Sequence, residues 1–332
     1  MSDFLLTIAI PVYNREVFLR RLLNTIIPYI NNDVELFVSD NASTDNTMEM
    51  MRSEFPDVIC YRNEENLGAD GNFLECYKKA SGKYVWLVGS DDIITEGAID
   101  RILQFITVNA NIDMPLIFLN HNNFEGQYTG VNCCKPAYLD VNENDKVVHS
   151  KNELIEYAGR QLTFMSAFLL KKDYIDKVLE PERFLKTNFI QTYFALEVAK
   201  NFSDFGIIFY PCVSQDLTPG NSYFHNRYSR LFHVFGSCMY EVLVNHATKV
   251  DFDKKQMRQK YIKGMVKSFA FWLLSAKAYD DKDGLSVFWK EVYPNLRTYP
   301  VFWFAIFPSA VMPAWVAKLY YGLKKSKRSI MT

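Results

Sequence analysis

The first two hundred residues alternate between short apolar runs and longer stretches in which apolar residues recur at helical spacing. The apolar runs predict strands at residues 5–12, 34–39, 58–61, 85–88, 116–119, 162–170 and 207–210. The helical spacing predicts helices at residues 15–30, 48–55, 72–80, 96–109, 173–179 and 188–200. This alternation is typical of a mostly parallel sheet flanked by helices, so the predicted fold class is α/β.

The pattern changes near residue 216. Residues 216–228 are polar and contain Pro219-Gly220, whereas residues 230–247 and 254–279 have long helical patterns with one apolar face. We therefore predict an α/β domain at residues 1–215 and a helical C-terminal region at residues 216–332.

Composition narrows the function classes. The chain is 49% hydrophobic with a net charge of −1, which predicts a packed protein and gives no sign of a nucleic-acid partner. The six cysteines form no zinc-ligand spacing, and neither a GxGxxG nor a Walker A loop is present. No secretory signal is visible at the N-terminus, so we expect a cytoplasmic location.

The C-terminal tail has a different composition. Residues 299–321 are rich in aromatic residues and contain three prolines, which argues against a membrane-spanning helix. After Glu291 the chain has no acidic residue and six basic ones: Arg297, Lys318, Lys324, Lys325, Lys327 and Arg328. Aromatic and basic residues together favour peripheral binding to the inner face of a membrane. The alternative is a helix pair packed on the domain with a solvated basic end.

Candidate chemistry lies at the end of the predicted strand 85–88. The residues Gly89-Ser90-Asp91-Asp92 follow it, and ligands of open α/β sheets bind at the carboxyl ends of strands. Two carboxylates there would suit Mg²⁺ or Mn²⁺. The alternative is a simple turn, because serine and aspartate are also common turn residues.

Three more polar loops follow predicted strands. They are Pro11-Val12-Tyr13-Asn14-Arg15, Asp40-Asn41-Ala42-Ser43-Thr44-Asp45 and Asn66-Leu67-Gly68-Ala69-Asp70-Gly71-Asn72. With Gly89-Ser90-Asp91-Asp92, these motifs resemble, in order, those of the family-two glycosyltransferases of GT-A fold. The resemblance covers residues 4–110. It implies a Rossmann-like, mostly parallel sheet and a site for a nucleotide sugar.

The resemblance assigns a nucleotide-sugar site to residues of the four loops. They are Pro11, Tyr13, Asn14, Arg15, Asp40, Ser43, Asn66, Gly68, Asp70, Asn72, Ser90 and Asp91. On this interpretation Tyr13 flanks the base, Asp40 accepts a hydrogen bond from a uracil N–H, and Gly68 permits close backbone approach. The structural alternatives are a ring packed on the core for Tyr13 and helix capping for Asp40, Asp70 and Asn72.

By the same resemblance, Asp91 and Asp92 are the catalytic and metal-binding carboxylates. Gly89 departs from the commonest pattern, because it stands where a further acid is usual. Inverting transfer also needs a general base, expected near the start of the helix at 188–200. Gln191 stands at that place and cannot accept a proton at neutral pH. Asp216 and His225 are weak candidates for the base, and Glu197 is expected to be structural.

These observations predict a metal-assisted inverting glycosyltransferase. The expected donor is a nucleotide sugar, with a UDP-sugar favoured over dTDP- and CDP-sugars. The expected acceptor is a surface polysaccharide such as an O-antigen or capsule, or a lipid-linked oligosaccharide. The alternative is a non-catalytic module that binds nucleotide sugars or glycans. A nucleotidyltransferase is disfavoured, because the first loop is neither basic nor glycine-rich.

Overall fold

The computed structural model describes residues 4–130, 134–218 and 228–319. The chain divides into two compact units. The N-terminal unit comprises Met1–Asn221 and Val250–Asp253, and the C-terminal unit comprises Ser222–Lys249 and Lys254–Thr332.

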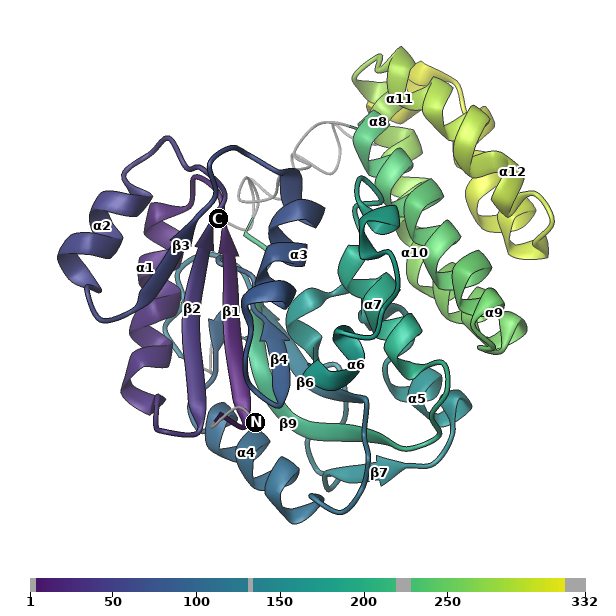
Figure 1. The fold of residues 1–332 in the computed structure, drawn as a ribbon. Helices are drawn as coiled ribbons and strands as arrows, with labels where there is room; N and C mark the ends of the chain where they lie inside the picture. Colours follow the sequence, from purple (N-terminus) through teal and green to yellow (C-terminus); the bar gives the residue numbers. More distant parts are fainter. Residues whose placement is uncertain (1–3, 131–133, 219–227, 320–332) are drawn as a thin grey trace. The chain divides into compact units, whose positions relative to one another are not determined.

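The N-terminal unit is built on one nine-stranded sheet (Figure 1). Its strands are β1 (Leu6–Val12), β2 (Val34–Asp40), β3 (Ile59–Arg62), β4 (Tyr84–Leu87), β5 (Ile93–Ile94), β6 (Leu116–Phe124), β7 (Lys146–Val148), β8 (Phe168–Lys171) and β9 (Phe205–Asp216). Its α-helices are α1 (Glu16–Ile26), α2 (Thr47–Glu54), α3 (Gly68–Lys79), α4 (Ala98–Val108), α5 (Lys151–Tyr157), α6 (Lys172–Ile175) and α7 (Ile190–Ala199).

The sheet has a parallel half and a mixed half. Strands β3, β2, β1 and β4 are neighbours in that order and run parallel, as predicted. Beyond β4 the order is β8, β6, β9 and β5, and β8 is antiparallel to both β4 and β6. The parallel half therefore brings the ends of β1, β2 and β4, and the loops that follow them, to one edge of the sheet.

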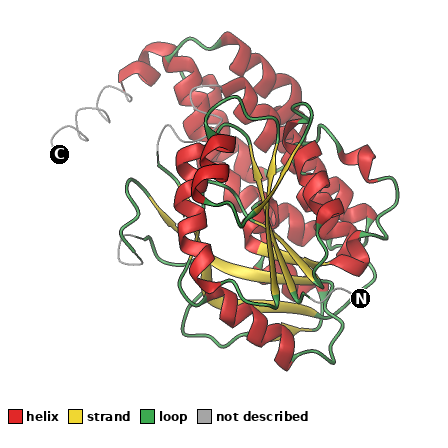
Figure 2. Ribbon diagram, turned by 60° about the vertical axis from the view of Figure 1, so that its left-hand side comes forward, coloured by secondary structure: helices red, strands yellow, loops and turns green. Residues whose placement is uncertain are grey.

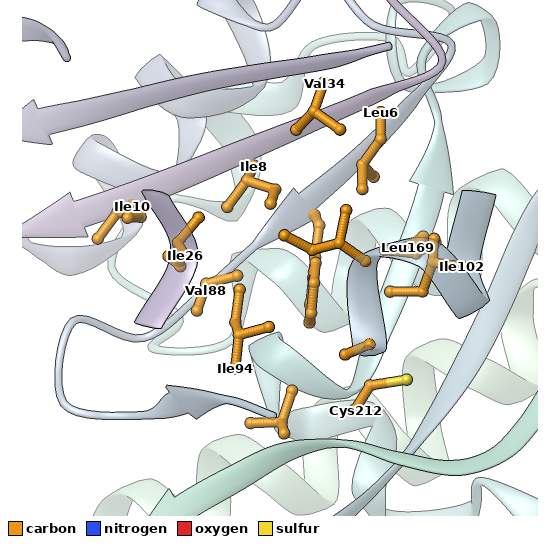
Figure 3. Packing of buried hydrophobic residues seen from close by; sticks show 14 of the residues in the cluster. Leu6, Ile8, Ile10, Ile26, Val34, Val88, Ile94, Ile102, Leu169 and Cys212 are labelled. Carbon is orange, nitrogen blue, oxygen red and sulfur yellow. The ribbon is translucent and has the colours of Figure 1, made fainter. Parts of the chain in front are cut away.

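The sheet is packed between helices (Figure 2). Alternate residues of β1 point to one face, where Leu6, Ile8 and Ile10 join a core with apolar residues of α1, α2 and α4 (Figure 3). Helices α3 and α7 pack together through the rings of Tyr77 and Phe194, whose centroids are 4.7 Å apart. Helix α3 buries one side, whereas all residues of α7 are buried, so α7 is a core helix and not an amphipathic surface helix.

Two predicted strands have different bounds in the structure. Residues 162–170 were expected to be one strand, but residues 159–167 form 3₁₀ turns and only Phe168–Lys171 is strand. The predicted strand 207–210 extends through Pro211 to Asp216 as β9. Pro211 is tolerated because the register between β6 and β9 shifts there, so no regular ladder bond requires its missing N–H.

The C-terminal unit is helical, as predicted. Its α-helices are α8 (Tyr228–Leu231), α9 (Ala247–Lys249), α10 (Lys254–Ala278), α11 (Lys282–Val287), α12 (Tyr293–Leu296) and α13 (Phe307–Val311). Wider π-helical turns lie between them at Phe232–Cys238, Glu241–His246, Phe288–Val292 and Phe302–Ile306. Within the described residues, none of the helices has the length and apolar character needed to cross a bilayer.

A buried histidine lies in the N-terminal unit. The ring of His121 stacks on Tyr138 and contacts Phe164, and burial lowers its pKa to about 4. In the unfolded chain a histidine takes up its proton near pH 6.5. Because the unfolded state then binds more protons, His121 lowers stability as the pH falls from about 6.5 towards 4.

We therefore expect the free energy of unfolding to fall by about 2 kcal/mol between pH 7.5 and 5.0 on account of this one group. Urea unfolding at both pH values should show that His121→Phe removes that part of the acid sensitivity. The same change at the exposed His149, which pairs with Asp204, is the control. Equal pH dependence in the wild type and the His121→Phe variant would contradict the prediction.

Candidate functional site

The acidic pair follows the carboxyl end of β4. Asp92 is 3% exposed, and its Oδ2 accepts a hydrogen bond of 2.6 Å from the Ser166 hydroxyl. The same hydroxyl oxygen accepts a 2.9 Å bond from the Gly89 N–H. Ser166 itself is anchored, because its carbonyl oxygen accepts a bond from the Trp86 indole. The acidic turn is thus fixed to the 3₁₀ segment that precedes β8.

Both carboxyl groups of the pair have raised pKa values, which is unusual for acids in a surface turn. Burial raises the pKa of Asp91, and the positive charge of Arg15 offsets part of that rise. Burial, and then the negative charge of Asp91, raise the pKa of Asp92 well above its usual range. Two carboxyl groups held together away from water are costly unless a proton or a cation joins them. This cost makes a simple turn a poor account of the pair.

Gly89 leaves the space in which the two carboxyl groups meet. A Cβ atom at this position would lie 2.7 Å from Asp92 Oδ2 and 3.2 Å from Asp91 Oδ1. The usual acid of the family pattern therefore does not fit here in the present arrangement. The departure noted in the sequence has a steric reason.

Gly89→Ala should consequently displace Asp92 from Ser166. We expect a loss of about 1–3 kcal/mol in the free energy of unfolding, as for other overpacked sites, and weaker binding of any cation at the pair. Urea unfolding and Mn²⁺ titration would measure both effects. Ser90→Ala adds no atom beside the carboxylates and serves as the control. Unchanged stability and Mn²⁺ affinity in Gly89→Ala would refute the steric account.

Arg21 of α1 lies beside the acidic pair. It donates through Nη2 to the Asp91 carbonyl oxygen and, over 3.1 Å, to Asp216 Oδ2 at the end of β9. Its guanidinium also lies over the rings of Phe18 and Phe124. Asp216 is buried, which raises its pKa, but hydrogen bonds from Thr218 and Arg21 outweigh burial and lower it. The Arg21 side chain thus contacts the turn after β4, the last residue of β6 and the last residue of β9.

The first and second loops lock onto each other. The Asn14 N–H donates to Ser43 Oγ over 2.9 Å, and Asn14 Oδ1 accepts a 2.7 Å bond from the Thr44 N–H. Asn14 and Ala42 both have positive φ, at 53° and 60°, which is uncommon for residues other than glycine. Such conformations persist where surrounding contacts enforce them, often at functional sites.

Asp40 holds the second loop from within. Its carboxylate accepts bonds from the Ser43 N–H and pairs with Arg62 over 3.1 Å, and its side chain is 0% exposed. It does not cap α2, which begins later, at Thr47. The geometry supports a role in shaping the loop, whereas the direct contact with a uracil base stays a prediction.

The third loop is held by asparagines. Asn41 donates to Asn66 Oδ1 and to the Gly68 carbonyl oxygen, and it accepts bonds from Asn63 and from the Leu67 N–H. Gly68 has φ +73°, and a Cβ there would meet no atom within 4 Å. Its need for glycine therefore comes from backbone conformation and not from close approach within the protein.

Asp70 and Asn72 lie inside α3, which begins four residues earlier than predicted. Asp70 accepts bonds from the N–H groups of Asn188 and Ile190 at the start of α7. Asn72 is buried and bonds both the hydroxyl and the carbonyl oxygen of Ser39. These are the structural roles that the sequence left open, and in this arrangement both side chains serve the fold.

The structure does not supply a general base at α7. Gln191 is buried and donates through Nε2 to the Thr163 carbonyl oxygen over 3.0 Å. Its Oε1 has no hydrogen-bond partner among the described residues. Glu197 pairs with Arg183 and Lys200, so its predicted structural role is confirmed. Asp216 lies beside the acidic pair, and His225 falls outside the described residues.

The remaining predicted residues line the same sheet edge. Pro11 pairs in register with Ser39, Tyr13 and Arg15 are half-buried, and Ser90 is buried. Sequence reasoning missed Arg21 and Ser166. No local pattern distinguishes either residue, because Ser166 shares its apolar run with Thr163 and Arg21 has the polar Asn24 and Thr25 one turn further along α1.

The acidic pair suits a divalent cation in its donor chemistry. Carboxylate oxygens are the preferred ligands of Mg²⁺ and Mn²⁺, and Asp91 Oδ1 and Asp92 Oδ2 face the same space over Gly89. A cation would also relieve their mutual repulsion. Within the described ranges, no three His, Cys, Asp or Glu side chains form a ready cation site, so substrate or water oxygens would complete the shell.

Known proteins with similar sequences support the resemblance to glycosyltransferases. A region of the chain is 40% identical over 115 residues to the abequosyltransferase RfbV of Salmonella typhimurium, covering 32% of this chain and 34% of that protein. Another match, 30% identical over 103 residues, is the GalNAc(5)-diNAcBac-PP-undecaprenol beta-1,3-glucosyltransferase of Campylobacter jejuni, with 30% of this chain and 33% of that protein covered. These matches span about a third of each curated relative.

The fold also matches a solved structure over most of its length. The S. aureus TarS fragment 1–349 in complex with UDP-GlcNAc superposes with a TM-score of 0.58 at 15% identity, covering 85% of this chain and 79% of that one. The predicted GT-A fold is thereby confirmed. The sequence model described as "Glycosyl transferase family 2" matches residues 7–173, which is half of the chain. This chain therefore belongs to glycosyl transferase family 2.

Proposed function

We propose that this protein transfers a sugar from a nucleotide sugar to a glycan acceptor. The observation that carries the proposal is the acidic pair after β4, in which the half-buried Asp91 has Arg15 nearby and the buried Asp92 is held by Ser166. The interlocked first and second loops lie at the same edge of the parallel half, where an α/β sheet binds its ligand. Family membership supports the same reaction class.

The proposed reaction is an inverting displacement. An acceptor hydroxyl oxygen forms a bond to the anomeric carbon, the bond from that carbon to the nucleotide diphosphate breaks, and a base takes the hydroxyl proton. Asp91 and Asp92 would hold Mn²⁺ or Mg²⁺, which when bound offsets negative charge on the departing diphosphate. Arg21 donates to the Asp91 carbonyl oxygen and would help to hold the Asp91 backbone during the reaction.

Asp216 is the base candidate that the geometry favours over Gln191. It is a carboxylate beside the acidic pair, and its lowered pKa keeps it unprotonated at neutral pH. Its position at the end of β9 rests on Arg21 and Thr218. Gln191, by contrast, uses its amide to tie α7 to the segment before β8.

For the donor we propose a UDP-sugar, with dTDP- and CDP-sugars as competitors. The TarS fragment that shares this fold was solved in complex with UDP-GlcNAc, which supports a uridine nucleotide. For the acceptor we propose a lipid-linked oligosaccharide or a surface polysaccharide, made at the inner face of the membrane. The name of the Campylobacter jejuni relative states an undecaprenol-linked acceptor for that protein.

One observation favours a different function. The family resemblance places a base at the start of α7, but the buried Gln191 stands there. A non-catalytic module that binds nucleotide sugars or glycans needs no base at this position. Such a module would bind the donor and release no nucleotide.

A panel assay separates the two functions. Purified protein is incubated with UDP-, dTDP- and CDP-sugars, with Mn²⁺, Mg²⁺ or EDTA, with and without membrane lipid extract, and the free nucleotide is measured. We expect turnover with one nucleotide class, greater with Mn²⁺ or Mg²⁺ than with EDTA. Donor binding by calorimetry without turnover under every condition would favour the module, and absence of both would reject the proposal.

A further inference from the structure

The two units carry opposite charge. The C-terminal unit has 18 Lys and Arg against 5 Asp and Glu, a net charge of +13. The N-terminal unit has 19 against 33, a net charge of −14. The overall charge of −1 hides this division. Helix α10 shows it most strongly, because it contains seven basic residues and no acidic one.

The same unit exposes apolar side chains near its C-terminal end. Residues 298–319 contain one charged side chain, Lys318. Phe302, Ile306 and Ala310 are buried and face the rest of the unit. The exposed large apolar side chains of this segment, which we call the aromatic face, are Val301, Trp303, Phe304, Val311, Trp315 and Leu319.

The aromatic face runs against the usual pattern of a surface helix. A helical segment at a water interface normally buries one apolar stripe and exposes charged residues. Here the outward positions are apolar as well, with Phe304 84% and Trp315 66% exposed. An apolar surface of this kind marks an interaction site.

We propose that the aromatic face and the basic residues of the C-terminal unit dock this protein on an anionic lipid surface. Tryptophan and phenylalanine favour the boundary between lipid headgroups and acyl chains, and lysine and arginine are attracted to anionic headgroups. The face contains no acidic residue that an anionic surface would repel. The purpose of docking rests on the proposed lipid-linked acceptor, but docking itself can be measured without any transfer reaction.

The charge pattern disfavours a symmetric contact with a second copy, and the exposed apolar side chains disfavour a nucleic acid. A second copy would bring another C-terminal unit of +13 against the first, so like charges would oppose a symmetric contact. The phosphates of a nucleic acid would bind the basic residues, but they make no favourable contact with the exposed Val301, Val311 and Leu319. An anionic bilayer can bind both kinds of side chain, because its headgroups attract the basic residues and its acyl chains take up the aliphatic ones.

The test is co-sedimentation of the full chain with vesicles of phosphatidylcholine alone or with 30% phosphatidylglycerol. We expect binding to the anionic vesicles, at least tenfold weaker binding to the neutral ones, and a marked loss from 0.1 to 0.5 M NaCl as the Debye length shortens. Trp303 and Trp315 fluorescence should shift to the blue on binding, because both indoles are exposed in the free protein.

The deciding variant is Phe304→Glu with Trp315→Glu, which should weaken binding to anionic vesicles at least tenfold. The matched control is Val108→Glu with Leu179→Glu in the N-terminal unit, whose side chains are 75% and 78% exposed and which adds the same charge. The control should stay within about threefold of wild type, and thermal unfolding checks that both variants fold.

Three results would overturn the proposal: equal losses in the two variants, no binding of the wild type, or displacement from vesicles by mixed-sequence RNA at equal phosphate concentration. Calorimetric binding of UDP in the absence of vesicles is measured on the same samples. The failure of docking is thereby distinguished from the failure of the proposed donor site.

Discussion

Asp92→Asn is expected to lower sugar transfer by about a hundredfold to a thousandfold without unfolding the protein. Removing one preorganised electrostatic group from an active site typically costs this much in rate. The fold should tolerate the change, because asparagine has the shape of the protonated acid, and burial already raises the pKa of Asp92 well above its usual range. The Ser166 hydroxyl can still donate to the remaining oxygen.

Asp91→Asn should have an effect of similar size, since the two carboxyl groups face one space over Gly89. Nucleotide release from the preferred donor gives the rate, and Mn²⁺ titration gives the cation affinity. The control is Asp100→Asn, an exposed acid on α4 in the same unit. A variant with either substitution that keeps more than a tenth of wild-type activity would place the reaction elsewhere.

The parallel half of the sheet could be predicted because its signals are local. Each of its strands is a short apolar run, each helix has regular apolar spacing, and each polar loop follows its strand directly. Loops at the ends of parallel neighbours must meet at one edge. The acidic pair and the loops that contain Asn14 and Ser43 could therefore be placed at one edge of the sheet from the sequence, although the Asn14–Ser43 contact itself was not predicted.

The 3₁₀ segment before β8 could not be predicted in the same way. Residues 162–170 are mostly apolar and mostly buried, and a short apolar run does not by itself distinguish a strand from a turn. Ser166 is one of two polar residues in that run, with Thr163, and its partner Asp92 lies 74 positions away. No local pattern encodes a contact over that separation.

The third loop shows a different limit of prediction from the sequence. Its motif was singled out as part of the nucleotide-sugar site, but the motif alone did not show which atoms its side chains engage. Asn66 holds Asn41 and the Gly68 N–H, and Asp70 caps the start of α7. The Asn66–Asn41 contact spans 25 positions and the contact of Asp70 with the start of α7 spans 118, whereas the Asn66–Gly68 contact is local. A motif can thus identify a site edge while its residues serve the framework of that edge.

Arg21 is the residue on which the second large effect is expected. Arg21→Met should lower the free energy of unfolding by about 3 kcal/mol, because it leaves the buried Asp216 carboxylate without its ion pair. It should also reduce transfer, since the Asp91 carbonyl oxygen loses its donor and the acidic turn is no longer held to α1. Urea unfolding and nucleotide release measure the two losses.

The neighbouring Arg20 provides a matched control. It lies on the same helix and pairs with Glu16 and Glu54 at the surface, where ion pairs contribute little, so Arg20→Met should change both readouts only slightly. Adding Asp216→Asn to Arg21→Met should restore most of the lost stability, because the stranded charge is removed, but it should not restore transfer. If the double variant were less stable than Arg21→Met alone, the stranded carboxylate would not be the cause, and Arg21 would act mainly through its packing on Phe18 and Phe124.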